Sequence, residues 1–223
     1  MKAIVCVKQV PDTSGKVAVN ADGTLDRASM QTIINPDDMN AMEAALALKD
    51  ETGCKVVVVT MGPPPAEGML RELIAMGADE AVLVSAREFG GSDTFATSQI
   101  VAAAIKKIGL EDEDIVFCGR QAIDGDTAQV GPQLAEKLGI PQISYVAGIE
   151  KNGNTVTCKR MLEDGYMMIQ TKTPCLLTCV KELNQPRYMS IPGIVGCYEK
   201  PLSVYNYETL KDDPLIELDT IGL

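Results

Sequence analysis

Histidine is absent from all 223 residues of the chain, and its absence excludes more functions than any motif that is present. Without an imidazole there is no Ser-His or Cys-His nucleophile pair, no imidazole metal ligand and no imidazole acid or base. Most hydrolase mechanisms are therefore excluded.

Positive charge and long apolar runs are also scarce. The 20 basic and 31 acidic residues give a net charge of −11, which removes the electrostatic attraction that usually dominates nucleic-acid binding. The longest apolar runs, such as IVAAAI at residues 100–105, have about six residues, whereas a membrane-spanning helix needs roughly 20. We therefore expect no nucleic-acid partner and no membrane span. The apolar run before Pro11 lacks the features of a secretory signal, which predicts a cytoplasmic location.

No C-x-x-C pair occurs among the seven cysteines, which are Cys6, Cys54, Cys118, Cys158, Cys175, Cys179 and Cys197. An odd number of cysteines in a chain that is not exported indicates reduced thiols rather than a disulfide set. Cys175 and Cys179 would face the same side of a strand. We expect ordinary core thiols there rather than a metal or cluster site, because the ligand spacings of such sites differ.

Short β-branched runs bounded by turn residues alternate with helical segments along the first 140 residues. The runs predict strands at residues 2–8, 55–62, 80–85 and 114–119. Near-continuous hydrophobic strands that are separated by helices are typical of a parallel sheet covered on both faces. The sequence therefore predicts an α/β fold.

The helical segments have recognisable ends. The first begins at Asn35 and Pro36, where Asn35 is expected to cap the helix and Pro36 suits the first helical position, and it ends at Gly53. The second ends at Gly77 and the third runs from Ser92 or Asp93 to Gly109. A fourth helix opens either at Asp126 or Thr127, with a bend at Pro132, or only at Gly131 and Pro132.

The remaining segments have a different pattern. Alternation around Asp22 and Gly23 predicts a small hairpin at residues 17–27. Strand-like runs separated by NGN and EDG turns predict an antiparallel meander over residues 142–180 that extends or flanks the sheet. Prolines and glycines after Leu183 predict an extended arm. We therefore divide the chain into an α/β domain at 1–183 and an appended segment at 184–223.

Ligands of open parallel α/β sheets bind at the carboxyl ends of the strands, so the loops that leave those ends are the candidate site. The most unusual loop is GRQAIDGDTAQVGPQ at residues 119–133. Glycine-bearing turns that lead into helix N-termini suit a phosphate, although no Walker or G-x-G-x-x-G motif is present. By spacing alone, the Gly-Asp-Thr turn is either a helix cap or part of a ligand site.

The motifs CVKQVPD, INPDD, AMGAD, GRQAIDGDTAQVGPQLAEKLGIPQ and NQPRYMSIPG occur in this order along the chain. Together they resemble the beta subunit of electron-transfer flavoproteins over nearly the whole length. The resemblance implies a Rossmann-like fold of the adenine nucleotide alpha hydrolase type and an alpha-subunit partner. The heterodimers of this family carry electrons between a dehydrogenase and another acceptor through FAD.

The resemblance also implies the cofactor-binding residues. The backbone of Cys6 would meet the adenine, residues 35–38 would lie beside it, and Met61 would approach the nucleotide. Arg120 would neutralise a diphosphate or be a solvated surface arginine. The phosphate and ribose contacts would come from one continuous stretch. The full set is Cys6, Asn35, Pro36, Asp37, Asp38, Met61, Gly119, Arg120, Gln121, Ala122, Ile123, Asp124, Gly125, Asp126, Thr127, Ala128, Gln129 and Val130.

One branch of the family keeps only AMP in the beta subunit, and a largely anaerobic branch holds a second FAD there and uses NADH for electron bifurcation. FGGSDTFATS at residues 89–98 resembles the loop of the second branch that adjoins the flavin diphosphate. Asp93, Thr94 and Thr97 would then adjoin this phosphate, or they only cap the helix. We favour FAD over AMP, with NADH as the electron donor and a low-potential acceptor such as ferredoxin.

Residues 184–193 resemble the family's recognition loop, which binds an acyl-CoA dehydrogenase or another flavin dehydrogenase. Tyr188 and Ile191 are the implied partner-binding residues, and Ile191 either anchors in a pocket of the partner or packs in the core. Family members continue beyond TIGL with an arm that contacts the alpha subunit, so we expect this arm to be truncated here.

Two other functions are compatible with the residues. The chain could be a stand-alone adenine-nucleotide sensor or ligase-like protein. It could also be an enzyme that uses Asp124 and Asp126 as catalytic carboxylates. In the flavoprotein hypothesis no side chain acts as a catalyst, because the flavin is the reacting group, and this agrees with a chain that lacks histidine.

Overall fold

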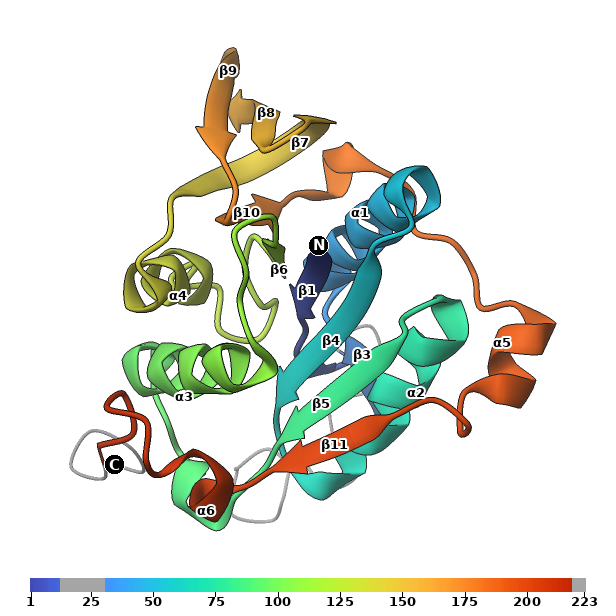
Figure 1. Cartoon of the computed structure of the whole chain (residues 1–223), viewed down its shortest axis with the longest axis vertical. Coiled ribbons are helices and arrows are strands. Elements are labelled where there is room, and N and C mark those ends of the chain that lie inside the picture. The colour runs from blue at the N-terminus through green and yellow to red at the C-terminus, as the bar shows by residue number, and fades with distance from the viewer. Residues whose placement is uncertain (13–30, 218–223) are drawn as a thin grey trace, which may run out of the picture.

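A computed structural model describes residues 1–12 and 31–217 (Figure 1). The hairpin predicted at residues 17–27 lies outside the described residues. A nine-stranded sheet forms the centre, with the strand order β11-β5-β4-β1-β6-β10-β7-β8-β9. Its strands are β1 (Lys2–Cys6), β4 (Lys55–Met61), β5 (Glu80–Val84), β6 (Ile115–Gly119), β7 (Gln142–Asn152), β8 (Thr155–Leu162), β9 (Gly165–Lys172), β10 (Cys175–Cys179) and β11 (Leu202–Tyr205).

Helices cover both faces of this sheet, as predicted. They are α1 (Pro36–Thr52), α2 (Glu67–Met76), α3 (Thr94–Ile108), α4 (Val130–Leu138), α5 (Ile191–Gly196) and α6 (Tyr207–Leu210). Along β4, Val56 and Val58 pack into the core layer that contains α1 and α2, whereas Val57 and Val59 pack into the layer of α3 and α4. This alternation buries the strand on both sides and explains its continuous hydrophobic run. The α/β fold class is confirmed.

The order of the parallel strands defines where a ligand site can form. From β1 the chain proceeds to β4 and then β5 on one side, and then returns to β6 on the other side of β1. The loops after β1 and β6 therefore diverge at the carboxyl ends of these two strands. Such a switch point leaves a crevice at that edge of an open α/β sheet. A two-stranded ribbon, β2 (Gln9–Pro11) and β3 (Thr32–Ile34), lies next along the chain after β1.

The predicted meander is only partly correct. Strands β7, β8 and β9 are antiparallel and extend the sheet beyond its helical layers (Figure 1). Strand β10, however, pairs in parallel with both β6 and β7. The chain thus returns from the meander and inserts Cys175–Cys179 as a fully buried central strand.

The extended arm predicted after residue 183 also differs from the structure. Residues 184–200 cross the outside of α1 and α2, and β11 then joins the sheet in parallel with β5 (Figure 1). Asn40 and Asn184 exchange side-chain hydrogen bonds, and Arg187 donates to Glu43 and Asp50. Arg71 donates to the carbonyls of Cys197 and Lys200. These bonds attach the segment to the helices beneath it.

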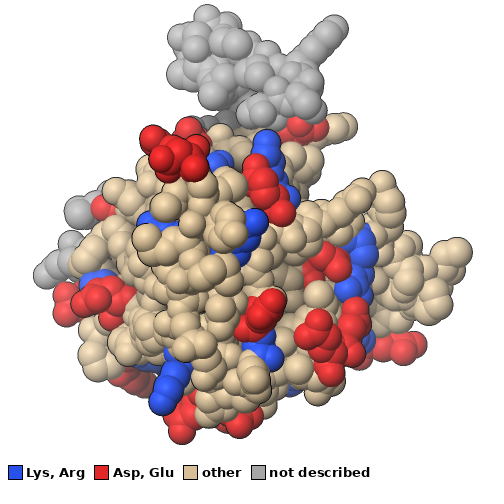
Figure 2. Space-filling view, turned by 90° about the horizontal axis from the view of Figure 1, so that it is seen from above, with Lys and Arg blue, Asp and Glu red and all other residues tan. Residues whose placement is uncertain are grey.

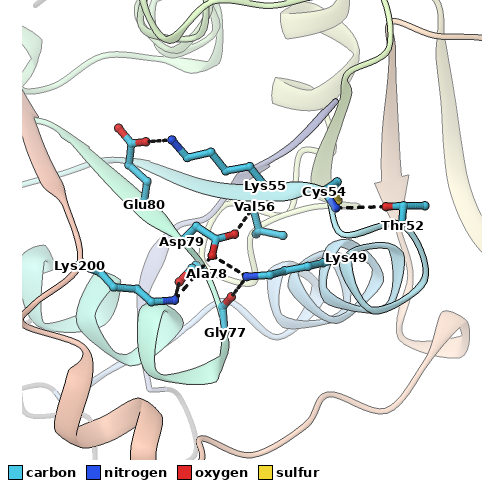
Figure 3. A network of polar contacts seen from close by, with 10 residues as sticks. All are labelled: Lys49, Thr52, Cys54, Lys55, Val56, Gly77, Ala78, Asp79, Glu80 and Lys200. Atoms are coloured by element: carbon cyan, nitrogen blue, oxygen red, sulfur yellow. Dashed lines mark hydrogen bonds and ion pairs between the residues drawn. The ribbon is translucent and has the colours of Figure 1, made fainter.

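Asp79, which directly precedes β5, connects α1, β4 and the segment before β11 at the amino-terminal edge of the sheet (Figure 3). One carboxylate oxygen accepts from the Lys49 ammonium at 2.6 Å, and the other accepts from the backbone N–H of Val56 at 2.9 Å. Lys200 lies 3.7 Å from the same carboxylate and donates to the carbonyl of Ala78. Burial opposes ionisation of Asp79, but the bonds from Lys49 and Val56 outweigh it and hold the pKa of this carboxyl below its ordinary value.

Replacing Asp79 with alanine is expected to lower the free energy of unfolding by about 2 kcal/mol, because a half-buried ammonium and a backbone N–H lose their acceptor. Glu80→Ala is the matched control, since Glu80 pairs with Lys55 at the exposed surface and should contribute at most about 1 kcal/mol. Urea denaturation measures both values. Equal losses in the two variants would contradict the role assigned to Asp79.

Candidate functional site

A cavity of about 360 Å³ opens at the carboxyl ends of β1, β4 and β6. The start of α1 and the start of α3 contribute to its wall, and residues 118–122 and 125–131 form another side. The cavity therefore lies at the switch point of the strand order, where an open α/β sheet binds its ligands.

Most of the predicted cofactor-binding residues line this cavity. They are Cys6, Asn35, Asp38, Met61, Asp93, Thr94, Thr97, Gly119, Arg120, Gln121, Ala122, Gly125, Asp126, Thr127, Ala128, Gln129 and Val130. Four others do not line it, namely Pro36, Asp37, Ile123 and Asp124. The cavity also contains residues that were not predicted, namely Val7, Lys8, Val59, Ser92, Val101, Cys118 and Gly131. Lys8 could have been predicted from the sequence, because it belongs to the CVKQVPD loop at the carboxyl end of the first strand.

A buried carboxylate, Asp38, joins the ends of β1 and β6 beneath the cavity. It accepts from the backbone N–H of Lys8 at 2.8 Å and from that of Gly119 at 2.9 Å. Burial raises the pKa of Asp38 to about 7, and the hydrogen bonds from these N–H groups and from Asn35 oppose that rise only in part. Asp38 thus connects the backbone after β1 to the end of β6, and its charge changes near neutral pH.

The raised pKa of Asp38 predicts a pH-dependent stability. The folded-state value of about 7 lies above the ordinary value of 3.8, so the contribution is fully present below pH 3.8 and is lost as the pH rises through 7. Acidification from pH 7 to 5.5 should therefore raise the free energy of unfolding by about 2 kcal/mol. Urea titrations of the wild type and Asp38→Asn at several pH values measure this slope. Parallel pH curves for the two proteins would exclude Asp38 as its source.

Gly119 lets helix α1 approach the end of β6. A Cβ atom at this position would lie 2.3 Å from Oδ1 of Asp38 and 2.7 Å from backbone atoms of Asp37 and Asp38. No side chain fits there. The first turn of α1 is therefore held directly against the strand end that forms the cavity floor.

Asn35 occupies the predicted N-cap position and Pro36 the first helical position, but the Asn35 side chain makes no capping hydrogen bond. Its amide instead donates to the carbonyl of Gln121 at 2.8 Å and accepts from the N–H of Ile123 at 3.1 Å. Asn35 is fully buried. This side chain satisfies two backbone groups of the 119–131 loop and holds that loop against the start of α1.

Two ion pairs lie around the loop. Lys8 donates to both carboxylate oxygens of Asp124 at 2.8 Å, and Arg120 lies 3.2 Å from Asp37. Asp124 and Asp37 therefore neutralise cations of the cavity wall instead of lining the cavity. Burial raises the pKa of Asp37, and the Arg120 guanidinium opposes this rise.

The backbone of the loop adopts an unusual conformation. Asp126 and Ala128 have φ values of 56° and 53°, in the left-handed region that side chains disfavour. Helix α4 opens at Val130, which agrees with the prediction of a late start and leaves residues 120–129 outside the helix. The N–H groups of Val130 and Gly131 have no acceptor within α4 because they belong to its first turn. Successive backbone N–H groups in such a loop can surround an anion.

The start of α3 forms the opposite wall. Asp93 accepts from the N–H of Ala96 at 2.8 Å and so caps the helix, while the hydroxyl of Thr94 donates to the side chain of Gln129 at 3.1 Å. The capping role is therefore real, and the same residues also line the cavity. Two helix N-termini, of α3 and α4, consequently border one cavity, where their dipoles favour negative charge.

The groups that line this cavity suit ligand binding. Val59, Met61 and Val101 supply apolar wall, and the loop supplies carboxylates, hydroxyls and backbone N–H groups. Within the described residues there is no group of three or more His, Cys, Asp or Glu side chains placed to hold a metal ion.

The two predicted partner-binding residues lie elsewhere. Tyr188 is 94% exposed and Ile191 is 79% exposed, and neither lines the cavity. Ile191 therefore does not pack in the core. On the face of the molecule seen in Figure 2, acidic and basic side chains are interspersed, and the described residues form no broad basic surface there. Within the described part of the chain, no helix has the length and apolar character required to span a membrane.

Comparison with known proteins identifies the family. Residues 22–207 match the family described as the electron transfer flavoprotein domain. The chain is 73% identical to the acryloyl-CoA reductase electron transfer subunit gamma of Anaerotignum propionicum over 224 residues, which cover 100% of this chain and 84% of that protein. It is 53% identical over 215 residues to the caffeyl-CoA reductase-Etf complex subunit CarD of Acetobacterium woodii, with 96% and 81% covered. It is also 53% identical over 213 residues to the electron transfer flavoprotein subunit beta of Clostridium acetobutylicum, with 96% and 81% covered.

Proposed function

The chain belongs to the electron transfer flavoprotein family, and on this basis we propose that its cavity binds FAD through the adenine nucleotide. It acts as a beta-type subunit that works with an alpha subunit in an electron-transfer complex. The observation that carries the cofactor proposal is the convergence of two helix N-termini and a loop with left-handed residues on one cavity at the switch point.

The residues of the cavity match the chemical groups of an adenine nucleotide. The N–H groups at the start of α4 and the hydroxyl of Thr127 donate to phosphate, and Asp126 accepts from ribose hydroxyls. Met61 and Val59 provide apolar contact for a flat ring. Asp38 and Asn35 do not react. They hold the strand ends and the loop at the separation that the nucleotide requires.

FAD is favoured over AMP because the start of α3 belongs to the same cavity as the 119–131 loop. Asp93, Thr94 and Thr97 add polar groups to the lining of this cavity, which suits a second phosphate. When bound, the flavin supplies hydride acceptance and one-electron transfer. We propose NADH as donor, ferredoxin or a similar low-potential carrier as one acceptor, and electron bifurcation in the cytoplasm as the process served.

AMP is the alternative ligand, and one observation favours it. Asp93 and Thr94 already have partners, in Ala96 and Gln129, so the start of α3 does not require a ligand. Cofactor extraction distinguishes the two cases. The purified complex of this chain with its alpha subunit is denatured, and the released nucleotides are separated and quantified. Two FAD per complex support the proposal, whereas one FAD and one AMP replace it with the non-bifurcating function. Absence of any nucleotide would contradict both.

Reduction by NADH tests the donor directly. Anaerobic addition of NADH to the complex should bleach the absorbance of the flavin bound to this chain. If the complex contains two FAD but is not reduced by NADH, the assignment of FAD as cofactor stands and NADH is excluded as the electron donor.

We further propose that residues 184–223 serve partner recognition, separately from the nucleotide-binding part at 1–183. The two reductase-associated relatives suggest a partner of the acyl-CoA dehydrogenase class. The bonds of Asn184 and Arg187 to α1 hold Tyr188 and Ile191 outward on an ordered backbone, so little entropy is lost when a partner binds.

Replacing Ile191 with alanine is therefore expected to weaken binding of the dehydrogenase by about 30-fold, the effect of an apolar anchor worth about 2 kcal/mol. Nucleotide content should stay unchanged, because Ile191 does not line the cavity. Val204→Ala is the control, since Val204 is also exposed but lies on β11. Calorimetric titration measures the affinities. Equal affinities for the two variants would remove Ile191 from the interface.

A further inference from the structure

Two thiols stand side by side at the cavity floor. Cys6 ends β1, Cys118 lies on β6, and the two residues are direct partners in the parallel pairing of these strands. Partners in adjacent strands are about 4.8 Å apart, which lies within the Cα separation of about 4.4 to 6.8 Å that a disulfide spans. Both residues line the cavity and both belong to the same face of the sheet.

The two thiols differ from each other in exposure, and they differ from the remaining five cysteines because both line the cavity. Cys6 is half-buried, whereas Cys118 is 6% exposed. The other cysteines are all buried, and among them none lines the cavity. A small oxidant that enters the cavity therefore meets Cys6 first and finds Cys118 directly beside it.

We propose that Cys6 and Cys118 form a redox-active dithiol that closes to an intramolecular disulfide when the cavity is empty and is protected when it is occupied. Its oxidant is a low-molecular-weight disulfide. The Cys6 thiolate attacks one sulfur of the oxidant, and one thiol leaves. The Cys118 sulfur then attacks the Cys6 sulfur of the mixed disulfide, and the second thiol leaves. Two protein thiols are oxidised and one small disulfide is reduced to two thiols.

The environment of Cys118 supports this order of events. Two causes raise the pKa of the Cys118 thiol well above its ordinary value: mainly a hydrogen bond with Cys6, and also burial. Cys118 is therefore a poor first nucleophile. Once the Cys6 sulfur is part of a mixed disulfide, it no longer carries the negative charge that disfavours a neighbouring thiolate. Burial remains, and the second step is therefore the slower one.

Protection by nucleotide rests on the function proposed above. A nucleotide in the cavity covers Cys6 and excludes the oxidant. By linkage, if the nucleotide disfavours the disulfide, the disulfide must weaken nucleotide binding by the same factor. Under oxidising conditions the disulfide would thus form in subunits that lack their cofactor and not in subunits that carry it.

Oxidised glutathione is the probe for the test, applied to the full chain in complex with its alpha subunit after removal of nucleotide. Peptide mapping by mass spectrometry identifies the products on this chain. The wild type should yield a Cys6–Cys118 cross-linked peptide, Cys118→Ser should retain one glutathione on Cys6, and Cys6→Ser should remain unmodified at Cys118. Cys54→Ser, which removes an isolated buried thiol, should behave as the wild type. Glutathione that remains on Cys6 in the wild type, or no reaction at all, would overturn the proposal.

The same samples separate this inference from the proposed function. AMP at a hundredfold excess over its Kd leaves about 1% of the cavities empty, so it should slow disulfide formation on the order of 100-fold. If AMP binds but does not slow disulfide formation, the proposed protection of the dithiol by bound nucleotide is overturned. If the disulfide forms but neither AMP nor FAD binds, the dithiol stands and the nucleotide function fails.

Discussion

Replacing Gly119 with alanine is expected to abolish nucleotide retention and to lower the free energy of unfolding by about 3 kcal/mol. The new Cβ atom would lie 2.3 Å from Oδ1 of Asp38 and 2.7 Å from the backbone of α1. Since two of these contacts are backbone atoms, no side-chain rotation relieves them, and overpacking of this kind destabilises a core. The relief available is separation of α1 from β6, which breaks the bond from the Gly119 N–H to Asp38.

The loss of nucleotide follows from the same movement. Asn35 precedes α1 and holds the 119–131 loop, so a shift of α1 displaces both the floor and the side of the cavity. We expect affinity for AMP or FAD to fall at least about 100-fold, since displaced donors cost more than 1 kcal/mol each. Gly68→Ala on α2 is the control, because a Cβ there meets no atom within 4 Å. Urea denaturation and calorimetric titration give the two quantities. Nucleotide binding by Gly119→Ala at wild-type affinity would show that the site lies elsewhere.

The parts of the fold that sequence predicted well are those determined locally. The strands predicted at 55–62, 80–85 and 114–119 agree within about two residues with β4, β5 and β6. Their β-branched runs are buried on both faces, and Gly53, Gly77 and Gly109 end the preceding or following helices. Local propensity, pattern and capping all favour the same elements there, which is why the prediction succeeds.

The strand that sequence missed, β11, and the pairing that it predicted wrongly, that of β10, are both defined by distant partners. Strand β11 has only four residues and pairs with β5 about 120 residues earlier. Strand β10 resembles the meander strands before it in composition, but it pairs with β6 across the intervening helix and hairpins. The local hydrophobic pattern does not determine which strands pair with each other, because strand formation depends on tertiary packing.

The candidate site shows the same division. Spacing alone indicated only helix starts near strand ends, and the family resemblance identified most of the cavity residues. It did not reveal that Asp124 pairs with Lys8 instead of lining the cavity, because this pairing depends on where two loops meet. The cap position predicted at Asn35 is correct, but its side chain does not cap the helix. The capping preference is local, whereas the buried amide bonds to Gln121 and Ile123 of a distant loop.

This use of Asn35 predicts the second large effect. Asn35→Ala should lower nucleotide affinity by about 30-fold and the free energy of unfolding by about 3 kcal/mol. Asn35 is completely buried, and its removal leaves the carbonyl of Gln121 and the N–H of Ile123 without partners. Each unsatisfied backbone group costs about 1 to 3 kcal/mol. The loop can recover part of this by moving toward water, and that movement withdraws residues 119–131 from the cavity.

Loss of stability and loss of binding must be separated, and the same helix provides the comparison. Asn40, which lies in α1, is also a buried asparagine, and its amide also bonds to a distant segment, through Asn184. Asn40→Ala should therefore destabilise the chain by a similar amount, but it should leave nucleotide affinity unchanged because Asn40 does not line the cavity. If both variants lose affinity equally, the loss reflects general destabilisation. If only Asn35→Ala loses affinity, the loss is specific to the buried amide that lines the cavity and holds the 119–131 loop.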